Sequence, residues 1–355
     1  MRNRVAGSEV SSHQSPVTVG SLSEGDLIAR IQEQLPPAPD WLLVGIGDDA
    51  AVVEPERNRV EVLSVDALIE GVHFDRAFVP PEAIGHRALA VNLSDLAAMG
   101  AAPRLALLSF ALPAGLPLAD FEGMIVGLAR LAASHRIHVV GGNLTRSPGP
   151  LMIDITVVGS VKRRQALTRA GARPGDEIYV SGTIGAAAAG LSMLRETSYN
   201  TTDTASLLRN SCIDRYLRPE PRVRLGLLLS RNRAASASID LSDGLADGVH
   251  RIAEASGVGA IIDADALPID PGVRAWFEER GIDPVTEALT AGDDYELLMA
   301  VRPRTGRRLA AAMRCGVPLT RIGRCTENRA TLLRVKNGSA VTEAELPSGG
   351  YDHFR

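Results

Sequence analysis

Residues 45–49 (Gly-Ile-Gly-Asp-Asp) lie between two short apolar runs, residues 41–44 and 50–53, each typical of a strand. Glycine permits backbone conformations that a Cβ would forbid. Two adjacent carboxylates about 4 Å apart repel each other by about 4 kcal/mol at an effective dielectric constant of about 20. A strand–turn–strand unit with paired acids, in a chain that repeats such acids elsewhere, therefore predicts a bound cation.

The same segment matches the dinucleotide fingerprint Gly-x-Gly-x-x-Ala, and Asp66 follows the next strand as a ribose-binding acid would. A turn of that kind must open a helix, whereas residues 50–53 are strand-like and Pro55 follows soon after. The residues left before Val60 are too few for a crossover helix of a dozen or more residues. This context argues against a dinucleotide site.

Length and composition indicate a globular protein of two domains, since the chain has 355 residues, 45% hydrophobic and 23% charged. A net charge of −4 gives no general attraction to nucleic acid or to an anionic membrane. No run of 18 apolar residues predicts a membrane span. The three cysteines are widely spaced, without a C-x-x-C pair, which fits a reducing cytoplasm.

Only two of the 38 basic side chains are lysines, Lys162 and Lys336. The chain therefore has neither the Gly-Lys-Ser/Thr of a P-loop nor the strand lysine of a protein kinase. If it binds phosphates, it does so with arginine, backbone amides and metal ions.

Strands alternate with helices in both halves, which predicts an α/β or α+β fold. We expect a disordered tail at 1–20, an N-terminal domain at 21–160 and a C-terminal domain at 161–355, with a basic, turn-rich junction at 160–174. Ser23 and Asp26 predict a capping box at the start of the first helix. Further expected features are helices at 81–99 and 120–135, strands at 60–65, 137–140, 151–158, 175–182 and 259–263, a glycine corner at 141–143 and a loop at 196–211.

The acids form the strongest candidate site: Asp48, Asp49, Asp66, Asp95, Asp240 and Asp243. Most of them could instead be turn formers or helix caps. Asp95 is harder to explain in that way, because the middle of an apolar helix is a poor place for an unpaired carboxylate. Carboxylates at strand ends suit Mg²⁺, which completes its octahedron with water and phosphate oxygens. The residue types thus leave a Mg²⁺–nucleotide site and structural acids as alternatives.

Other polar residues, taken singly, can be explained without a functional role. His73 could be an ordinary loop histidine, and the pair His135 and His138 lacks the third ligand of a zinc site. Arg169 could belong to a solvated charge run. Residues 182–185 (Gly-x-x-Gly) could hold a phosphate or could allow tight packing.

Several motifs taken together resemble the thiamine-monophosphate kinase family, over residues 22–354 and in consistent order. Besides residues 45–50, they are 64–66, 71–74, 90–101 (Ala-Val-Asn-Leu-Ser-Asp-Leu-Ala-Ala-Met-Gly-Ala), 167–176, 239–245, 292–297 and 350–354 (Gly-Tyr-Asp-His-Phe). The resemblance implies a fold like that of aminoimidazole ribonucleotide synthetase. In that fold an N-terminal α/β domain pairs with a second subunit into an intersubunit β-barrel, and ATP binds between it and a C-terminal α/β domain.

The resemblance also implies a cytoplasmic homodimer that transfers a phosphoryl group directly, in line, from ATP to thiamine monophosphate, giving thiamine diphosphate without a phosphoenzyme. It implies that several Mg²⁺ ions are held by Asp49, Ser64, the main chain of Val65, Asp66, Asp95, Asn143, Asp240 and Asp243. It places ATP against Gly142, Asn143, Arg169 and Ser242, and the thiamine substrate against His73 and Asp293.

This chain departs from the family pattern at three positions. Asn143 stands where many members have Asp, Asp293 shortens a glutamate, and Ser348 replaces an aromatic residue. These changes put substrate and metal affinity in doubt more than the chemistry. Two alternatives remain: an ATP-dependent synthetase on the same fold and a nucleotide-binding protein without activity. The synthetase is disfavoured because the N-terminal tail has no cysteine or lysine and the C-terminus lacks a reactive cysteine.

Overall fold

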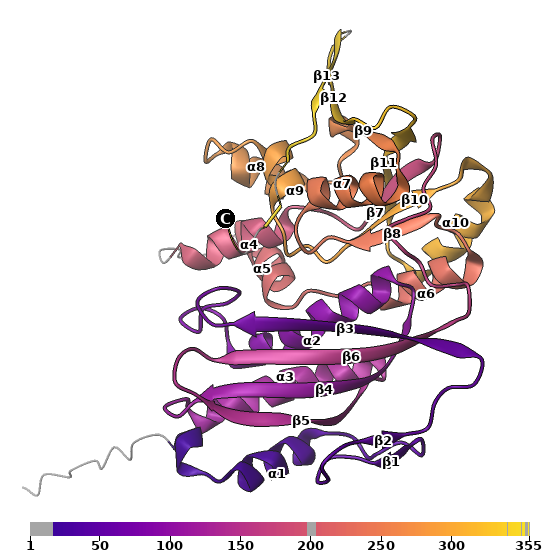
Figure 1. Cartoon of the computed structure of the whole chain (residues 1–355). Coiled ribbons are helices and arrows are strands. Elements are labelled where there is room, and N and C mark those ends of the chain that lie inside the picture. Colours follow the sequence, from indigo (N-terminus) through magenta and orange to yellow (C-terminus); the bar gives the residue numbers. More distant parts are fainter. Residues whose placement is uncertain (1–16, 197–203, 339, 349, 352–353, 355) are drawn as a thin grey trace, which may run out of the picture.

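The computed structural model describes residues 17–196, 204–338, 340–348, 350–351 and 354, which form three sheets and the helices around them (Figure 1). A short hairpin of β1 (Leu42–Val44) and β2 (Val52–Val53) follows α1 (Glu24–Gln34). The other two sheets divide the described chain into an N-terminal and a C-terminal half.

The N-terminal half is a four-stranded sheet with helices on one face. Helices α2 (Pro81–Ala98) and α3 (Leu118–His135) pack against each other on that face, while no described helix covers the opposite one (Figure 1). In sheet order, the strands are β3 (Arg59–Ile69), β6 (Met152–Lys162), β4 (Ala102–Pro113) and β5 (His138–Ser147).

The C-terminal half is a seven-stranded mixed sheet. In sheet order, its strands are β13 (Ala340–Glu345), β12 (Thr331–Asn337), β9 (Gly259–Asp263), β11 (Leu319–Thr326), β7 (Glu177–Ser181), β10 (Leu297–Val301) and β8 (Ala237–Asp240). Its helices are α4 (Ala186–Arg195), α5 (Thr204–Leu217), α6 (Val223–Asn232), α7 (Leu245–Ser256), α8 (Pro271–Glu278), α9 (Pro284–Thr290) and α10 (Gly306–Ala312).

One of the two apolar clusters contains residues of both halves, and the other belongs to the C-terminal half. Strand β10 alternates between two clusters: Leu297 and Met299 join the cluster that contains α2 and α3, whereas Leu298 and Ala300 join the C-terminal one. Helix α6 approaches α2 so closely that a Cβ on Gly226 would lie 2.0 Å from the carbonyl oxygen of Ala97. The mixed α/β architecture predicted from the sequence is confirmed.

Several local predictions are confirmed. Ser23 accepts a hydrogen bond from the Asp26 amide while the Asp26 carboxylate accepts one from the Ser23 amide, which is the capping box. Helix α2 starts at Pro81 and ends before Gly100, whose φ of +65° is accessible to glycine. The strand at 259–263 matches β9.

Three predictions were wrong in part. Residues 141–143 form no corner, because β5 continues through them after a shift of register at Val140. A Cβ on Gly142 would lie 1.9 Å from the Leu108 carbonyl oxygen of β4. Strand β3 runs past Asp66 to Ile69 instead of ending there. Residues 204–211 belong to α5 instead of a loop, and 197–203 lie outside the described residues.

The expected tail at 1–20 overlaps the ordered chain. Residues 1–16 lie outside the described residues, but Val19 is buried and its amide donates to the Leu116 carbonyl at 2.9 Å. The apolar segment from Leu105 to Leu118 contributes to β4 and the turn that follows it. Among the described helices, none is both long and apolar enough to cross a membrane.

The crossing of α2 and α3 depends on glycine, since a Cβ on Gly127 would lie 1.9 Å from the Glu82 carbonyl oxygen. We expect Gly127→Ala to lower the free energy of unfolding by about 1–3 kcal/mol, because a packed interface must shift to admit the methyl group. Gly25→Ala is the matched control, since its Cβ would meet only Ser23 Oγ at 3.9 Å at an exposed position of α1. Calorimetric midpoints for both variants test this, and an unchanged midpoint for Gly127→Ala would contradict it.

Candidate active site

Three acids predicted as metal ligands lie where α2 meets both large sheets. Asp66 lies on β3, Asp95 on the last turn of α2 and Asp240 at the end of β8. The hydroxyl of Ser94 donates to Asp240 Oδ2 at 2.7 Å, and the hydroxyl of Ser64 donates to Asp95. Two consecutive residues of α2 are therefore hydrogen-bonded to different halves of the protein.

Burial raises the pKa of three of these acids, and repulsion between acids adds to it for Asp66 and Asp240. Burial raises the pKa of Asp240 to about 7, and repulsion from Asp95, Asp66 and Asp243 adds to the effect. Asp66 retains an exposed surface, yet partial desolvation and then repulsion from Asp95 and Asp243 raise its pKa to about 7. Burial also raises the pKa of Asp95, against the hydrogen bond to its carboxylate and the attraction of Arg169. The four acids thus occupy one electrostatic neighbourhood, with Arg169 beside it.

This donor set fits Mg²⁺ ions that keep most of their own water. Hydrogen-bonded carboxylates with raised pKa values are stabilised by a divalent cation, and Mg²⁺ is normally held by only one or two of them plus phosphate oxygens. Within the described residues, no three Asp, Glu, His or Cys side chains converge closely enough to hold one ion directly. Each ion would therefore be shared between protein, water and a phosphorylated ligand.

Polar residues of α2 and the loop after β8 fix the backbone around these acids. The buried Asn92 accepts a hydrogen bond from the Asp66 amide through Oδ1 at 3.0 Å and donates to the Ala88 carbonyl at 3.0 Å. The Ser242 carbonyl accepts a 2.8 Å hydrogen bond from the Asp293 amide. The candidate nucleotide contact Ser242 and the candidate substrate contact Asp293 are thereby placed side by side.

His73 and Asp293 are connected through Tyr216. The His73 imidazole accepts a hydrogen bond from the Ile69 amide through Nδ1 at 3.0 Å, and its carbonyl accepts one from the Tyr216 hydroxyl at 3.4 Å. The guanidinium of Arg87 lies over the Tyr216 ring, 4.3 Å from its centroid, and forms a 3.1 Å ion pair with Asp293 Oδ1. The two candidate substrate contacts therefore lie at the ends of one chain of contacts.

Two other candidates, Gly142 and Asn143, lie at the far edge of the four-stranded sheet. Strand β5, with Gly142 and Asn143, forms the edge opposite β3. Three strand spacings of about 4.8 Å separate the two edges by roughly 14 Å. Asn143 pairs with Ser109 on the uncovered face, whereas Ser64 points toward α2. A single chain therefore does not bring Asn143 to Asp66.

Asp49 and the side chain of Val65 likewise do not join the acids. Asp49 is exposed in the β1–β2 hairpin, and Trp41, just before that hairpin, packs edge-on against His138 at the start of β5, with ring centroids 5.6 Å apart. The side chain of Val65 is 56% exposed on the uncovered face of the sheet, so only its main chain could join a site around Asp66.

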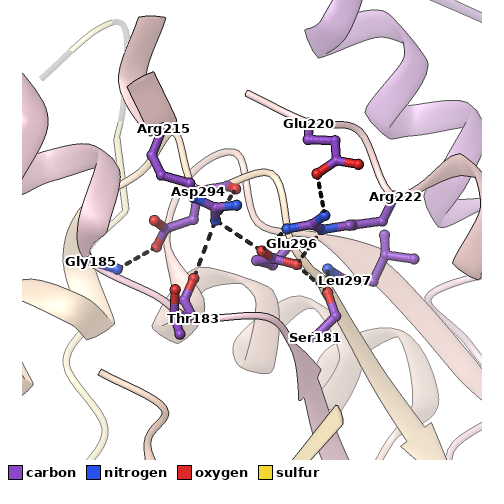
Figure 2. Close-up of polar contacts among 9 residues, drawn as sticks. All are labelled: Ser181, Thr183, Gly185, Arg215, Glu220, Arg222, Asp294, Glu296 and Leu297. Atoms are coloured by element: carbon purple, nitrogen blue, oxygen red, sulfur yellow. Dashed lines mark hydrogen bonds and ion pairs between the residues drawn. The ribbon is translucent and has the colours of Figure 1, made fainter. Parts of the chain in front are cut away.

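A buried ion cluster surrounds Glu296, three residues after Asp293 (Figure 2). Glu296 is fully buried and accepts from Arg222 at 2.6 and 2.7 Å, from Arg215 at 2.9 Å and from the Ser181 hydroxyl at 2.5 Å. A Cβ on Gly182 would lie 2.1 Å from Glu296 Oε1, so tight packing explains this glycine. The cluster fixes the start of β10 to α5 and to the segment before α6.

The sequence did not single out Arg87, Ser94, Tyr216 or Glu296 as functional residues. Arg87 and Ser94 carried a detectable signal, since both are polar residues within the apolar helix expected at 81–99. Nothing in the sequence marked Tyr216, because its partners lie more than a hundred residues away along the chain. Long-range pairs of this kind become visible only in the folded chain.

Comparison with known proteins identifies both halves. The family model "AIR synthase related protein, N-terminal domain" matches residues 47–161, and the corresponding C-terminal domain matches residues 173–336. The thiamine-monophosphate kinase of Bacillus subtilis is 36% identical over 322 residues, covering 88% of this chain and 94% of that protein. The Escherichia coli K12 enzyme of the same name is 37% identical over 332 residues, covering 93% and 98%.

Solved structures give the same result. A thiamine-monophosphate kinase from Stenotrophomonas maltophilia superposes with a TM-score of 0.78 at 39% identity, covering 90% of this chain and 98% of that one. AaThiL complexed with AMPPCP and TMP gives 0.72 at 32% identity, covering 95% and 99%. Escherichia coli HypE, a hydrogenase maturation protein, shares only the fold at 22% identity and a TM-score of 0.70. By its sequence and its fold, the chain belongs to the thiamine-monophosphate kinase family.

Proposed function

We propose that this protein phosphorylates thiamine monophosphate with ATP, giving thiamine diphosphate and ADP. The observation that carries the proposal is the acid cluster of Asp66, Asp95, Asp240 and Asp243 between the two halves, in a chain 36–37% identical to thiamine-monophosphate kinases over most of its length. A relative at 32% identity, AaThiL, has been solved with AMPPCP and TMP bound, which supports ATP as the phosphoryl donor here.

The reaction brings two polyanions together, so positioning and charge neutralisation account for most of the catalysis. Bound Mg²⁺ would supply positive charge to the phosphate oxygens of both substrates. Ser64 and Ser94 orient the carboxylates of Asp95 and Asp240 by hydrogen bonds, and the nearby Arg169 contributes positive charge for the nucleotide. Transfer is direct and in line, from ATP to the substrate phosphate.

For the ligands we propose the contacts that the family resemblance implies. Ser242 and Arg169 bind the nucleotide, and His73 and Asp293 bind thiamine monophosphate. The hydrogen bond between the Asp293 amide and the Ser242 carbonyl supports this, because it holds the two ligand regions next to each other. The domain boundary lies at residues 160–174, between the two matched family models.

We further propose a homodimer in which the uncovered face of the four-stranded sheet closes an intersubunit barrel. Leu63, Val65 and Leu107 are 65%, 56% and 40% exposed on this face, and exposed apolar residues of one sheet face mark an interaction surface. Barrel closure would also pair the open edges β3 and β5. Asn143 and Gly142, on β5, then lie at the subunit junction with the ATP and Mg²⁺ roles that the family implies. Three free cysteines support a cytoplasmic location.

Asp95→Asn tests the metal site. We expect kcat to fall by at least about 100-fold, because the variant removes a negative charge that positions the cations, while the hydrogen bond to Ser64 can persist. Production of thiamine diphosphate is measured at several Mg²⁺ concentrations, with circular dichroism to confirm folding. The control is Asp214→Asn, an exposed acid of α5 paired with Arg218, whose turnover should match the wild type. Normal turnover of Asp95→Asn would remove Asp95 from the site.

Magnesium affinity should depend on pH. Because the pKa values of Asp66 and Asp240 are raised to about 7, both are largely protonated at pH 6 and ionised at pH 8. Mg²⁺ binds the ionised form and displaces protons, so affinity falls below pH 7 by up to about tenfold per pH unit for each displaced proton. Titration calorimetry with Mg²⁺ alone, in buffers of different ionisation enthalpy, measures both quantities. Equal affinity at pH 6 and 8 without proton release would contradict the expectation.

Leu63→Glu tests the dimer. A charge on the uncovered sheet face should shift sedimentation from dimer to monomer, because burying an unpaired carboxylate in an interface is costly. Val341→Glu is the matched control, since Val341 is 56% exposed on β13 of the other large sheet. A wild-type protein that sediments as a monomer would overturn the proposed assembly.

A further inference from the structure

The burial of Arg87 costs free energy, because a charged guanidinium is removed from water. Arg87 lies in the first half of α2, its side chain is only 1% exposed, and its Nε has no hydrogen-bond partner among the described residues. Replacing a buried ionic group by an apolar residue of similar volume is often neutral or stabilising. Stability alone therefore does not account for an arginine here, and its partners indicate another purpose.

The first partner is the loop that carries Asp293. Asp293 and Tyr295 have φ values of +68° and +49°, a conformation that L-residues with side chains adopt at a cost. The Asp293 carboxylate is held through Oδ1 by Arg87 at 3.1 Å and by the Tyr295 hydroxyl at 3.0 Å. Because both contacts use Oδ1, Oδ2 is the oxygen available to a ligand, and the carboxylate keeps a fixed orientation.

The second partner is Tyr216. Arg87 donates to its carbonyl oxygen and lies over its ring, while the Tyr216 hydroxyl reaches the His73 carbonyl. The adjacent Arg215 is fixed by the fully buried Glu296 (Figure 2), so this end of α5 is anchored independently of Arg87. Arg87 therefore lies between an anchored helix end and a strained loop.

We propose that Arg87, with Tyr216, is the positioning residue that sets the separation and orientation of His73 and Asp293, and thereby the affinity for the phosphorylated acceptor. The proposal rests on the proposed function, which assigns these two residues to that substrate. Both side chains are almost fully buried, so they act through His73 and Asp293 and not by contact with the acceptor. The contribution of Arg87 is a fixed carboxylate at Asp293, which compensates for a side chain one methylene shorter than the glutamate usual in the family.

Arg87→Met tests the proposal, because it removes the charge and all donors at nearly constant length. We expect KM for thiamine monophosphate to rise about 10- to 100-fold, the range for losing a charge-assisted hydrogen bond, while KM for ATP changes less than twofold. Arg130→Met is the matched control. Arg130 is an exposed arginine of α3 that pairs with Glu82 of α2, and both KM values should stay unchanged when it is replaced. An equal change in the two KM values for Arg87→Met would overturn the proposal.

A double-mutant cycle with Asp293→Asn separates positioning from general support. If Arg87 acts through Asp293, Arg87→Met should have little further effect on KM for the acceptor in the Asp293→Asn background. Effects that multiply would mean that the two residues act independently, against the proposal. If Arg87→Met does not fold, Arg87→Lys takes its place, because lysine keeps the charge but lacks the planar fork needed for three contacts.

Direct binding distinguishes failure of this inference from failure of the proposed function. Calorimetric titration of the wild type and Arg87→Met with thiamine monophosphate, without ATP, measures acceptor affinity independently of turnover. Weaker binding by Arg87→Met supports the inference even if no thiamine diphosphate is formed. Equal binding by both proteins overturns it even if the kinase assay succeeds.

Discussion

The burial of helix α2 is the constraint on which the rest of the structure depends. The helix lies between the four-stranded sheet, α3, α6 and β8, so it has no wide solvent-facing side on which polar groups could be hydrated. Each buried polar side chain must therefore find a partner. Arg87 pairs with Asp293, Asn92 with the backbone of β3 and Ser94 with Asp240. Buried polar side chains of α2 thus exchange hydrogen bonds with water for hydrogen bonds within the protein, and these bonds hold the two large sheets in fixed positions relative to each other.

Features that depend on a few neighbouring residues could be predicted from the sequence. The capping box of α1 and the limits of α2 follow from side chains within one helical turn, where proline and glycine have fixed consequences. Four of the six acids that the sequence singled out, Asp66, Asp95, Asp240 and Asp243, lie near one another, and their role as metal ligands stays a prediction. Acids at strand ends and in an apolar helix are costly unless they share a partner, and the structure places these four within mutual electrostatic range.

Features that depend on register or on distant partners could not be predicted. Two adjacent glycines usually indicate a turn, yet those at 141–142 lie within β5, because a neighbouring carbonyl of β4 fills the space of a side chain at Gly142. The sequence has no mark of that contact. The separation of Asn143 from Asp66 likewise follows from strand order, which places their strands at opposite edges of one sheet. Family position alone could not tell which of the candidate residues lie near one another in the folded chain.

The acid cluster has a mechanical consequence, because its members belong to different halves of the protein. Asp66 and Asp95 come from the N-terminal half and Asp240 from the C-terminal half, and their carboxylates repel one another when ionised. This repulsion opposes any closer approach of the halves and grows as the pH rises past 7. The two halves share one apolar cluster, so they cannot relieve this repulsion by moving apart, and the packing between them must offset it. Because these acids have raised pKa values in the folded protein, their ionisation lowers the free energy of unfolding as the pH rises, and a cation bound between the halves would restore it.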